Sequence, residues 1–256
     1  MGHNPVLIKF GGSVITFKER PLTANFEAIN NISYKLGCLK IPIVIIHGGG
    51  SFGHYWSTKY DMHTRPDQYD SHGISIVHES MIALNQIIVN SMIKAGMDPY
   101  AVMPSTFISG HKPIVKKIKE LQSIAERGII PITFGDIVHL ENAKYFILSG
   151  DVLMSLLSKI LRPSKVIFTV NVDGIYKNMK NKDIIKVLNN DDKSINFSEV
   201  VQDVTGGMKR KVTEAFNISN YGIDVLLVNG LKPERIINAI RGQDFEGTLV
   251  KGMRSV

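Results

Sequence analysis

Cysteine is almost absent from this sequence of 256 residues. The single cysteine, Cys38, cannot form a disulfide within the chain, which is typical of proteins kept in a reducing compartment. No apolar run reaches the length of a membrane span, and the first residues lead directly into an expected strand rather than a signal peptide. We therefore expect a cytoplasmic protein in which Cys38 packs among apolar neighbours.

The sequence also lacks a concentrated basic region. A net charge of +7 favours an anionic partner, but the densest basic runs, at residues 116–119 and 209–211, are short. No basic stripe with interleaved aromatic residues is present, so binding of nucleic acid or of a membrane is not expected. A small phosphorylated ligand fits the charge better.

Two common nucleotide-binding patterns are missing as well. The sequence contains no G-x-x-x-x-G-K-[ST] P-loop. Gly48, Gly50 and Gly53 match the dinucleotide fingerprint G-x-G-x-x-G, but the acidic residue expected about 20 positions further on, after a second strand, is replaced by a polar run at residues 59–67. A dinucleotide-dependent oxidoreductase is therefore a less favoured alternative.

What the sequence does contain is a regular alternation of short apolar strands and amphipathic helices. Strands are expected at residues 6–10, 41–46, 99–104, 129–134, 165–170, 224–229 and 247–250, and a β-hairpin at residues 137–148. Helices are expected at residues 25–36, 74–95, 114–126, 152–161 and 234–240, with a further helix that accompanies the segment 203–211 and ends near residue 220. This order predicts the α/β class, with a mainly parallel central sheet covered on both faces.

Glycine turns follow several of these strands, at Gly11-Gly12, Gly48-Gly49-Gly50, Gly135 and Gly150. A backbone without Cβ atoms can bring consecutive N–H groups close to an anion, and a helix beginning there adds its positive dipole end. The carboxyl ends of parallel strands share one edge of a sheet, so these turns should gather there. A phosphate site is the favoured hypothesis, and tight turns without a ligand are the alternative.

Two charged or titratable residues stand out beside these turns. Lys9 interrupts the first apolar strand, where packing does not explain a lysine as well as chemistry does, although a side chain extending from an edge strand is the alternative. His54 follows the last glycine of the second turn and should lie at the rim of the anion site.

Five motifs in register resemble the amino acid kinase family over essentially the whole chain. They are Lys9-Phe10-Gly11-Gly12-Ser13, His47-Gly48-Gly49-Gly50, Ser149-Gly150-Asp151, Val172-Asp173-Gly174-Ile175-Tyr176 and Thr205-Gly206-Gly207-Met208-Lys209-Arg210-Lys211. Within the family, residues 51–54 and 134–136 are similar to the branch that phosphorylates isopentenyl phosphate, and more loosely to the fosfomycin kinases.

The resemblance implies an open αβα sandwich, a single domain over residues 1–256, in which residues 1–150 bind the phosphate acceptor and residues 151–256 bind ATP. It implies a cytoplasmic homodimer that converts isopentenyl phosphate into isopentenyl diphosphate for isoprenoid biosynthesis by an archaeal-type mevalonate route. Mg²⁺ would accompany ATP, held mostly by phosphate oxygens and water. A kinase for another small phosphate and a non-catalytic nucleotide sensor are the alternatives.

The resemblance also assigns roles to individual residues. Lys9, Lys18, His54, Asp151 and Lys211 would form the catalytic group, with Lys209 competing for the role of Lys211. Asp151 would orient Lys9 and Lys211 by ion pairs, or cap the helix that follows it, or do both. Because the acceptor is already an anion, catalysis would consist mainly of positioning and charge stabilisation.

The remaining expected site residues bind the two substrates. The acceptor phosphate would meet Gly49, Gly50, Gly53, His54 and Gly150. Its five-carbon tail would meet Ile74, Val77, Met81, Phe134, Ile137 and Phe146, each of which could equally be core. ATP would meet Lys9, Gly11, Gly12, Ser13, Lys18, Asp173, Gly174, Tyr176, Lys177, Gly206, Gly207 and Lys211. Whether residues 59–71 close over the substrate is left open.

Overall fold

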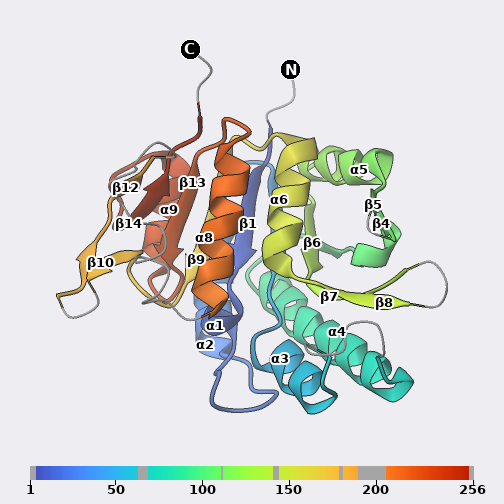
Figure 1. The fold of residues 1–256 in the computed structure, drawn as a ribbon. Coiled ribbons are helices and arrows are strands. Elements are labelled where there is room, and N and C mark those ends of the chain that lie inside the picture. Colours follow the sequence, from blue (N-terminus) through green and yellow to red (C-terminus); the bar gives the residue numbers. More distant parts are fainter. Residues whose placement is uncertain are drawn as a thin grey trace.

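The computed structural model describes residues 4–62, 69–110, 112–140, 144–178, 181–189 and 206–253. Within these ranges the centre is an eight-stranded sheet of order β12-β14-β13-β9-β1-β2-β6-β3 (Figure 1). All neighbouring strands pair in parallel there except β13 and β14. In chain order they are β1 (Val6–Phe10), β2 (Ile43–His47), β3 (Pro99–Ala101), β6 (Ile130–Phe134), β9 (Lys165–Val170), β12 (Val187–Leu188), β13 (Val225–Asn229) and β14 (Gly247–Val250). The predicted mainly parallel sheet is confirmed.

Each central strand sends alternate side chains to the two faces of the sheet. In β1, Val6, Ile8 and Phe10 join one apolar core, while Leu7 joins the other. Both faces are apolar because both are covered by helices, as is usual for parallel sheets. By the same alternation Lys9 lies on the face of Leu7.

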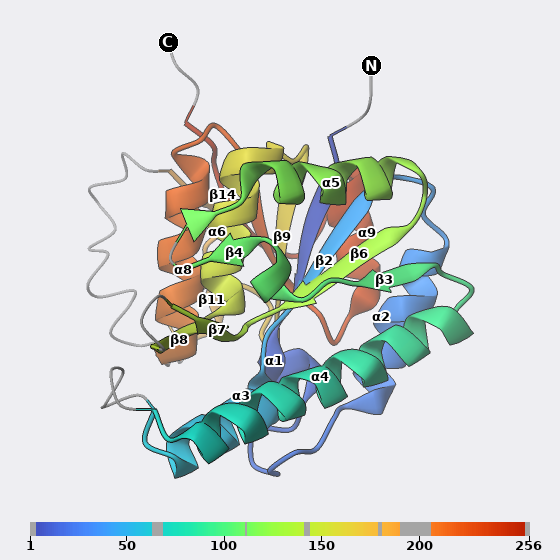
Figure 2. The ribbon, with the colours of Figure 1, turned by 90° about the vertical axis from the view of Figure 1, so that its right-hand side faces the viewer.

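Among the described residues, three helices cover each face, which gives an αβα sandwich (Figures 1 and 2). One face carries α2 (Phe26–Gly37), α4 (Ser71–Lys94) and α9 (Pro233–Arg241), and the other carries α5 (Val115–Glu126), α6 (Gly150–Leu161) and α8 (Gly206–Ser219). Side chains cap three of their N-termini: Asn25 accepts a hydrogen bond from the N–H of Ala28, and Asp70 and Ser149 act in the same way for α4 and α6.

The shorter elements extend from the ends of these strands. At the carboxyl edge, α1 (Gly12–Ile15) follows β1, α3 (Gly50–Lys59) follows β2, and the hairpin of β7 (Asp136–His139) and β8 (Tyr145–Leu148) follows β6 (Figure 1). The remaining elements are η1 (Pro104–Thr106), β4 (Ile108–Ser109), β5 (Lys112–Pro113), β10 (Tyr176–Asn178) and β11 (Asp183–Ile184). The predicted hairpin is confirmed, and its residues 141–143 lie outside the described residues.

Strand β1 joins the two parts of the chain. It pairs with β2 on one side and with β9 on the other. Strands that precede residue 150 therefore lie on one side of the β1–β9 junction, and strands that follow it lie on the other. The strand order reverses at this junction, which is where open α/β sheets bind ligands at their carboxyl edge.

Three sequence expectations need correction. Cys38 is exposed rather than packed, because it ends α2 two positions beyond Leu36 and so points away from the apolar stripe of that helix. Helix α4 begins at Ser71 rather than at residue 74, because Asp70 caps it. Strand β3 ends at Ala101, before Pro104 begins a 3₁₀ turn. Residues 63–68, within the stretch 59–71, lie outside the described residues.

The first glycine turn approaches the second so closely that Gly12→Ala should destabilise the fold. A Cβ on Gly12 would lie 2.4 Å from the N atom and 2.6 Å from the Cα atom of Gly50. We expect a loss of about 3 kcal/mol in the free energy of unfolding, measured by urea denaturation. The control is Gly128→Ala, where φ is +83° and nothing lies within 4 Å of the added Cβ. There the backbone conformation alone costs about 1 kcal/mol. Equal losses in both variants would contradict the close-approach argument.

Candidate active site

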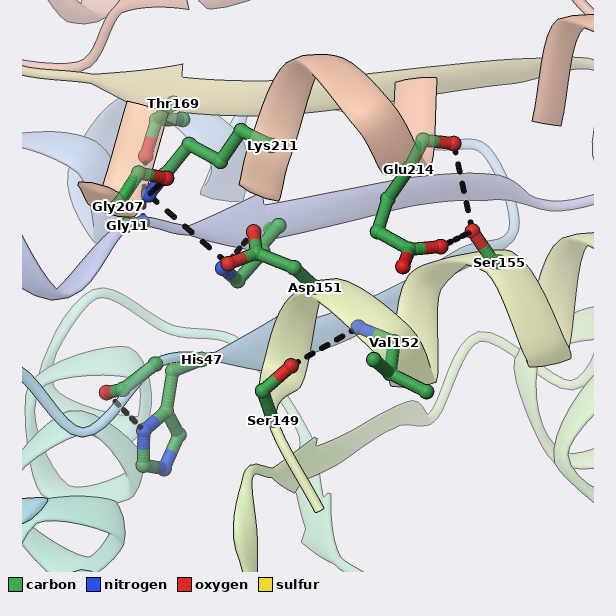
Figure 3. A network of polar contacts seen from close by, with 12 residues as sticks. Gly11, His47, Ser149, Asp151, Val152, Ser155, Thr169, Gly207, Lys211 and Glu214 are labelled. Atoms are coloured by element: carbon green, nitrogen blue, oxygen red, sulfur yellow. Dashed lines mark hydrogen bonds and ion pairs between the residues drawn. The ribbon is translucent and has the colours of Figure 1, made fainter. Parts of the chain in front are cut away.

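The end of β1 carries a buried lysine that pairs with helix α6. Lys9 is 3% exposed, and its Nζ donates a hydrogen bond to Oδ1 of Asp151. Nζ of Lys211, in α8, lies 4.0 Å from Oδ2 of the same carboxylate and donates to the carbonyl of Gly207 at 3.1 Å. Figure 3 shows Lys211 and Asp151 pointing toward each other from the two helices. One carboxylate thus lies between two lysines, the arrangement that the resemblance implies.

Asp151 does not cap helix α6. The hydroxyl of Ser149 accepts the hydrogen bond from the N–H of Val152, at 3.2 Å, and so caps α6 (Figure 3). Asp151 is the second residue of that helix, and its carboxylate faces the lysines. Of the two roles considered for Asp151, the structure shows the ion pairs.

Burial and charge set the protonation of this group. Burial is the main cause that lowers the pKa of Lys211 to about 8, the charge of Lys9 lowers it further, and Asp151 opposes both. Burial alone would raise the pKa of Asp151, but Lys9 and then Lys211 hold it below its usual value. The charge of Lys18, which is exposed, also lowers the pKa of Lys211. Lys209, the competing candidate, is exposed in α8.

The predicted glycine turns do gather around Lys9. A Cβ on Gly150 would lie 3.1 Å from Cε of Lys9, and one on Gly48 would lie 3.8 Å from its Nζ. Gly50 has a φ of +49°, and a Cβ there would lie 2.1 Å from Oγ1 of Thr16. Both the positive φ and the close approach require glycine at this position.

Helices α1 and α3 begin in these turns without side-chain caps. Some of their first N–H groups are used internally: Ser51 donates to Oγ1 of Thr16 at 2.9 Å. Just before α1, Gly11 donates to Oγ1 of Thr169, also at 2.9 Å, which ties the first turn to β9. An uncapped N-terminus with its positive dipole end favours an anion, so the edge suits phosphate groups.

A buried neutral histidine supports the second glycine turn. Burial lowers the pKa of His47 to about 4. Its Nδ1 lies 3.2 Å from the carbonyl oxygen of Gly48 (Figure 3), and its Nε2 lies 3.2 Å from Oδ1 of Asn85 in α4. Its ring stacks on Phe134 with centroids 5.1 Å apart. His47 therefore connects the turn to α4 and β6, a role that its motif gave no means to predict.

Two of the predicted acceptor residues, Gly53 and His54, lie about one helical turn beyond Gly49 and Gly50. Gly49 and Gly53 both face Met81 of α4, whose Sδ would be 3.0 Å and 3.2 Å from a Cβ at these positions. His54 is exposed on α3. The close packing of α3 on α4 thus depends on small residues at these two positions.

A small apolar cluster lies beside these turns, between α3, α4 and the β7–β8 hairpin. We call it the hairpin cluster. Its buried members are Met62, Val77 and Ile137, and its partly buried members are Trp56, Tyr60, Tyr69, Ile74, Tyr145 and Ile147. Three predicted tail-binding residues, Ile74, Val77 and Ile137, belong to it. Its aromatic members were not predicted: Trp56, Tyr60 and Tyr69 fall in polar stretches, and Tyr145 lies in the predicted hairpin without a signal that distinguishes it from core.

The other three predicted tail-binding residues lie elsewhere. Met81 packs against the glycines and Phe134 against His47. Phe146 pairs with Val138 in the hairpin and packs with it against a main core, whereas Ile137 pairs with Ile147 on the opposite face. The structure therefore does not bring Phe146 to the hairpin cluster, because strand alternation places it on the other side.

Two of the predicted ATP-binding residues, Asp173 and Tyr176, belong to a second polar group near the ends of β9 and β13. The carboxylate of Asp173 accepts hydrogen bonds from Asn229 at 2.9 Å, Lys232 at 3.1 Å and Arg235. These donors, Asn229 first, lower the pKa of Asp173 to about 2. The N–H of Asp173 also donates to the hydroxyl of Tyr176, at 3.3 Å. Asn229, Lys232 and Arg235 were not predicted from the sequence, since no motif marks them.

The other predicted ATP-binding residues follow the same edge. Gly174 has a φ of +155°. Gly206 and Gly207 begin α8, Ser13 is partly exposed in α1, and Lys177 is exposed in β10. Across the described residues, no three His, Cys, Asp or Glu side chains come together to hold a metal ion. None of the helices in those ranges is both long and apolar enough to cross a membrane.

Comparison with known proteins identifies the family. The model of the amino acid kinase family matches residues 4–229, which include all five motifs. The chain belongs to the amino acid kinase family. Membership of a kinase family implies the use of ATP.

Similar members of the amino acid kinase family are isopentenyl phosphate kinases. The one from Thermoplasma acidophilum is 33% identical over 252 residues, which cover 96% of this chain and 100% of that protein. The one from Methanothermobacter thermautotrophicus is 28% identical over 265 residues, covering 96% and 99%. A crystal structure of the T. acidophilum kinase in a product complex has a TM-score of 0.80 at 28% identity and covers 96% of this chain and 100% of that one.

The lowered pKa of Lys211 can be measured directly by NMR of protein with ¹³C-labelled lysine. We expect its ε resonance to titrate near pH 8, well below the ordinary lysine range. In Asp151→Asn the titration should move to lower pH, because the carboxylate now stabilises the ammonium form. Lys211→Arg assigns the resonance, and exposed Lys209 provides the internal control. A Lys211 titration that is unchanged in Asp151→Asn would contradict the coupling.

Proposed function

We propose that this protein transfers the γ-phosphoryl group of ATP to the phosphate group of isopentenyl phosphate, giving ADP and isopentenyl diphosphate. The observation that carries the proposal is the position of the hairpin cluster beside the glycine turns around Lys9. An acceptor with an anionic head and a short apolar tail matches that pairing of surfaces. The names of the similar kinases support the same acceptor.

The chemistry requires two anions to meet in line. An oxygen of the acceptor phosphate forms a bond to the γ-phosphorus while the bond from that phosphorus to the bridging oxygen breaks, and ADP leaves. The acceptor oxygen is already ionised, so no general base is needed. Lys9 would stabilise charge on the transferred group, Lys211 would act from the nucleotide side, and Asp151 would position both lysines.

The acceptor would be held at both of its ends. His54, Lys18 and the N–H groups of Gly49, Gly50 and Gly150 would bind phosphate oxygens, and Gly53 would leave room for them. Ile74, Val77 and Ile137 would contact the tail. Met81, Phe134 and Phe146 complete the set of proposed tail-binding residues, although in this structure they pack outside the hairpin cluster.

ATP would lie on the other side of the β1–β9 junction. Gly11, Gly12 and Ser13 would face its phosphates, as would Gly206 and Gly207 at the start of α8. Asp173, Gly174, Tyr176 and Lys177 would lie near the rest of the nucleotide. Apart from the turn at residues 11–13 and the lysines that face both substrates, residues 1–150 of this single domain would bind the acceptor and residues 151–256 the donor.

Magnesium would accompany ATP. The carboxylate of Asp151 lies between two lysines, which makes it a poor ligand for a cation. Phosphate oxygens and water would therefore supply most ligands, as is usual for Mg²⁺. The ion would offset the charge of the donor phosphates.

We also propose a homodimer, acting in cytoplasmic isoprenoid biosynthesis of the archaeal-type mevalonate route. Large apolar side chains are exposed near the β3 edge of the sheet: Ile93 is 57% exposed, Tyr100 55% and Ile129 39%. A second copy covering this edge would bury them.

The test of the reaction is ADP release from ATP and Mg²⁺ with a panel of acceptors. We expect strong turnover with isopentenyl phosphate and dimethylallyl phosphate, and little with fosfomycin, N-acetylglutamate or UMP. Lys9→Met should abolish transfer, while the control Lys94→Met, an exposed lysine at the end of α4, should not. Turnover confined to another acceptor would reject isopentenyl phosphate as the substrate.

A second measurement tests the acceptor side alone. His54→Ala should raise the KM for isopentenyl phosphate roughly tenfold, the loss of about one charge-assisted hydrogen bond, and leave the KM for ATP nearly unchanged. The control is Thr58→Ala, an exposed position in the same helix. Equal increases in both KM values would argue against the role of His54.

A further inference from the structure

A buried carboxylate connects the two walls of the hairpin cluster. Oδ2 of Asp136, the first residue of β7, lies 2.7 Å from Nδ1 of His78 in α4. The side chain of Asp136 is 3% exposed and that of His78 is 39% exposed. The other oxygen, Oδ1, accepts a hydrogen bond from the N–H of Ile137 at 2.8 Å. This pair takes no part in the Lys9–Asp151–Lys211 group.

Asp136 lies where the glycine turns meet the hairpin cluster. The residue before it, Gly135, is so close to Gly150 that a Cβ on Gly135 would lie 2.7 Å from the N atom of Gly150. The residue after it, Ile137, is a buried member of the hairpin cluster. Asp136 is therefore one residue from the proposed phosphate site and one residue from the proposed tail site.

On α4, His78 likewise lies between the proposed tail site and the proposed phosphate site. At 3.6 residues per turn, Ile74, His78, Met81 and Asn85 lie along one stripe of the helix. Ile74 joins the hairpin cluster, Met81 faces Gly49, and Asn85 contacts His47. His78 thus lies between the residue of α4 that reaches the tail site and those that reach the phosphate site.

The charges of the pair favour keeping the two elements together. The hydrogen bond to Asp136 raises the pKa of His78, and burial raises the pKa of Asp136 against the opposing effect of His78. Without the histidine, the carboxylate would keep only its bond to the adjacent N–H among the described contacts. A buried carboxylate with so few partners is unfavourable, so the pair resists separation of α4 from β7.

We propose that His78 and Asp136 are positioning residues that fix the separation of α4 and the hairpin and thereby limit the length of the acceptor tail. The inference rests on the proposed function, since it concerns the same acceptor. It differs from the tail-binding residues in mechanism: the pair does not touch the tail but holds the two surfaces that do.

The experiment compares three single variants in the intact protein. His78→Leu removes the donor at similar volume. His78→Asn keeps it, because an asparagine amide nitrogen can take the place of Nδ1. Glu79→Ala changes the exposed neighbour and serves as the control. For each, KM is measured for isopentenyl phosphate and for ATP, together with the ratio of kcat/KM for geranyl phosphate to kcat/KM for isopentenyl phosphate.

We expect His78→Leu to raise the KM for isopentenyl phosphate and the chain-length ratio each by about tenfold, the effect of one lost hydrogen bond to a charged group, with the KM for ATP nearly constant. His78→Asn and Glu79→Ala should stay close to the wild type. An unchanged ratio in His78→Leu, or the same change in His78→Leu and His78→Asn, would overturn the inference.

Two further outcomes keep the test decisive. Should His78→Leu fail to fold, Asp136→Asn replaces it: the weaker neutral hydrogen bond should raise the ratio about threefold, and no rise would overturn the inference. A wild-type protein without turnover on isopentenyl phosphate would reject the proposed function and this inference together. Normal wild-type turnover with unaltered ratios in the variants would reject only the inference.

Discussion

The negative charge of Asp151 between two lysines is the interaction on which the rest of the site depends. Buried ammonium groups are unfavourable unless they are paired, and Lys9 and Lys211 repel each other. The carboxylate holds both in place, yet it leaves the group with a net positive charge. This net positive charge lies at the edge of the sheet among the glycine turns. It suits phosphate groups, because their negative charge neutralises it.

The topology of the sheet explains why this group can form. Lys9 is the last but one residue of the central strand, Asp151 begins a helix on one face, and Lys211 belongs to the next helix on that face. The N–H of Gly11 donates a hydrogen bond to Oγ1 of Thr169 near the end of β9. This hydrogen bond links β1 to β9 at the strand-order reversal, beside the group of Lys9, Asp151 and Lys211. Two contacts hold α4 at the same edge, on the opposite side of the turns. They are the contact of His47 with Asn85 and the contact of His78 with Asp136.

The sequence predicted those features that leave a local pattern. Apolar runs, alternating periods and glycine turns located the longer strands, the helices that cover the sheet and the edge at which Lys9 lies, but not helix α3 or the two-residue strands β4, β5, β11 and β12. The pairing of Lys9 with Asp151, 142 residues apart, came from the family resemblance and not from any local signal. Contacts such as His78 with Asp136, 58 residues apart, or Arg235 with Asp173, 62 residues apart, have no motif, and only the packing of separate elements creates them. By contrast, strand alternation alone could have placed Phe146 and Ile137 on opposite faces of the hairpin.

The central position of β1 also has a consequence for synthesis of the chain. It is synthesised before the other strands that the structure describes, and β2 can cover one of its edges early. Its other edge pairs with β9, which begins at Lys165, so at about 5–20 residues per second that edge stays unpaired for roughly 8 to 30 seconds. Until Asp151 is synthesised, shortly before β9, Lys9 has no carboxylate partner, and its charge lies within an otherwise apolar strand. That charge works against adhesion of the exposed edge to other nascent chains, so the lysine proposed to act on the transferred group would also protect the unfinished sheet.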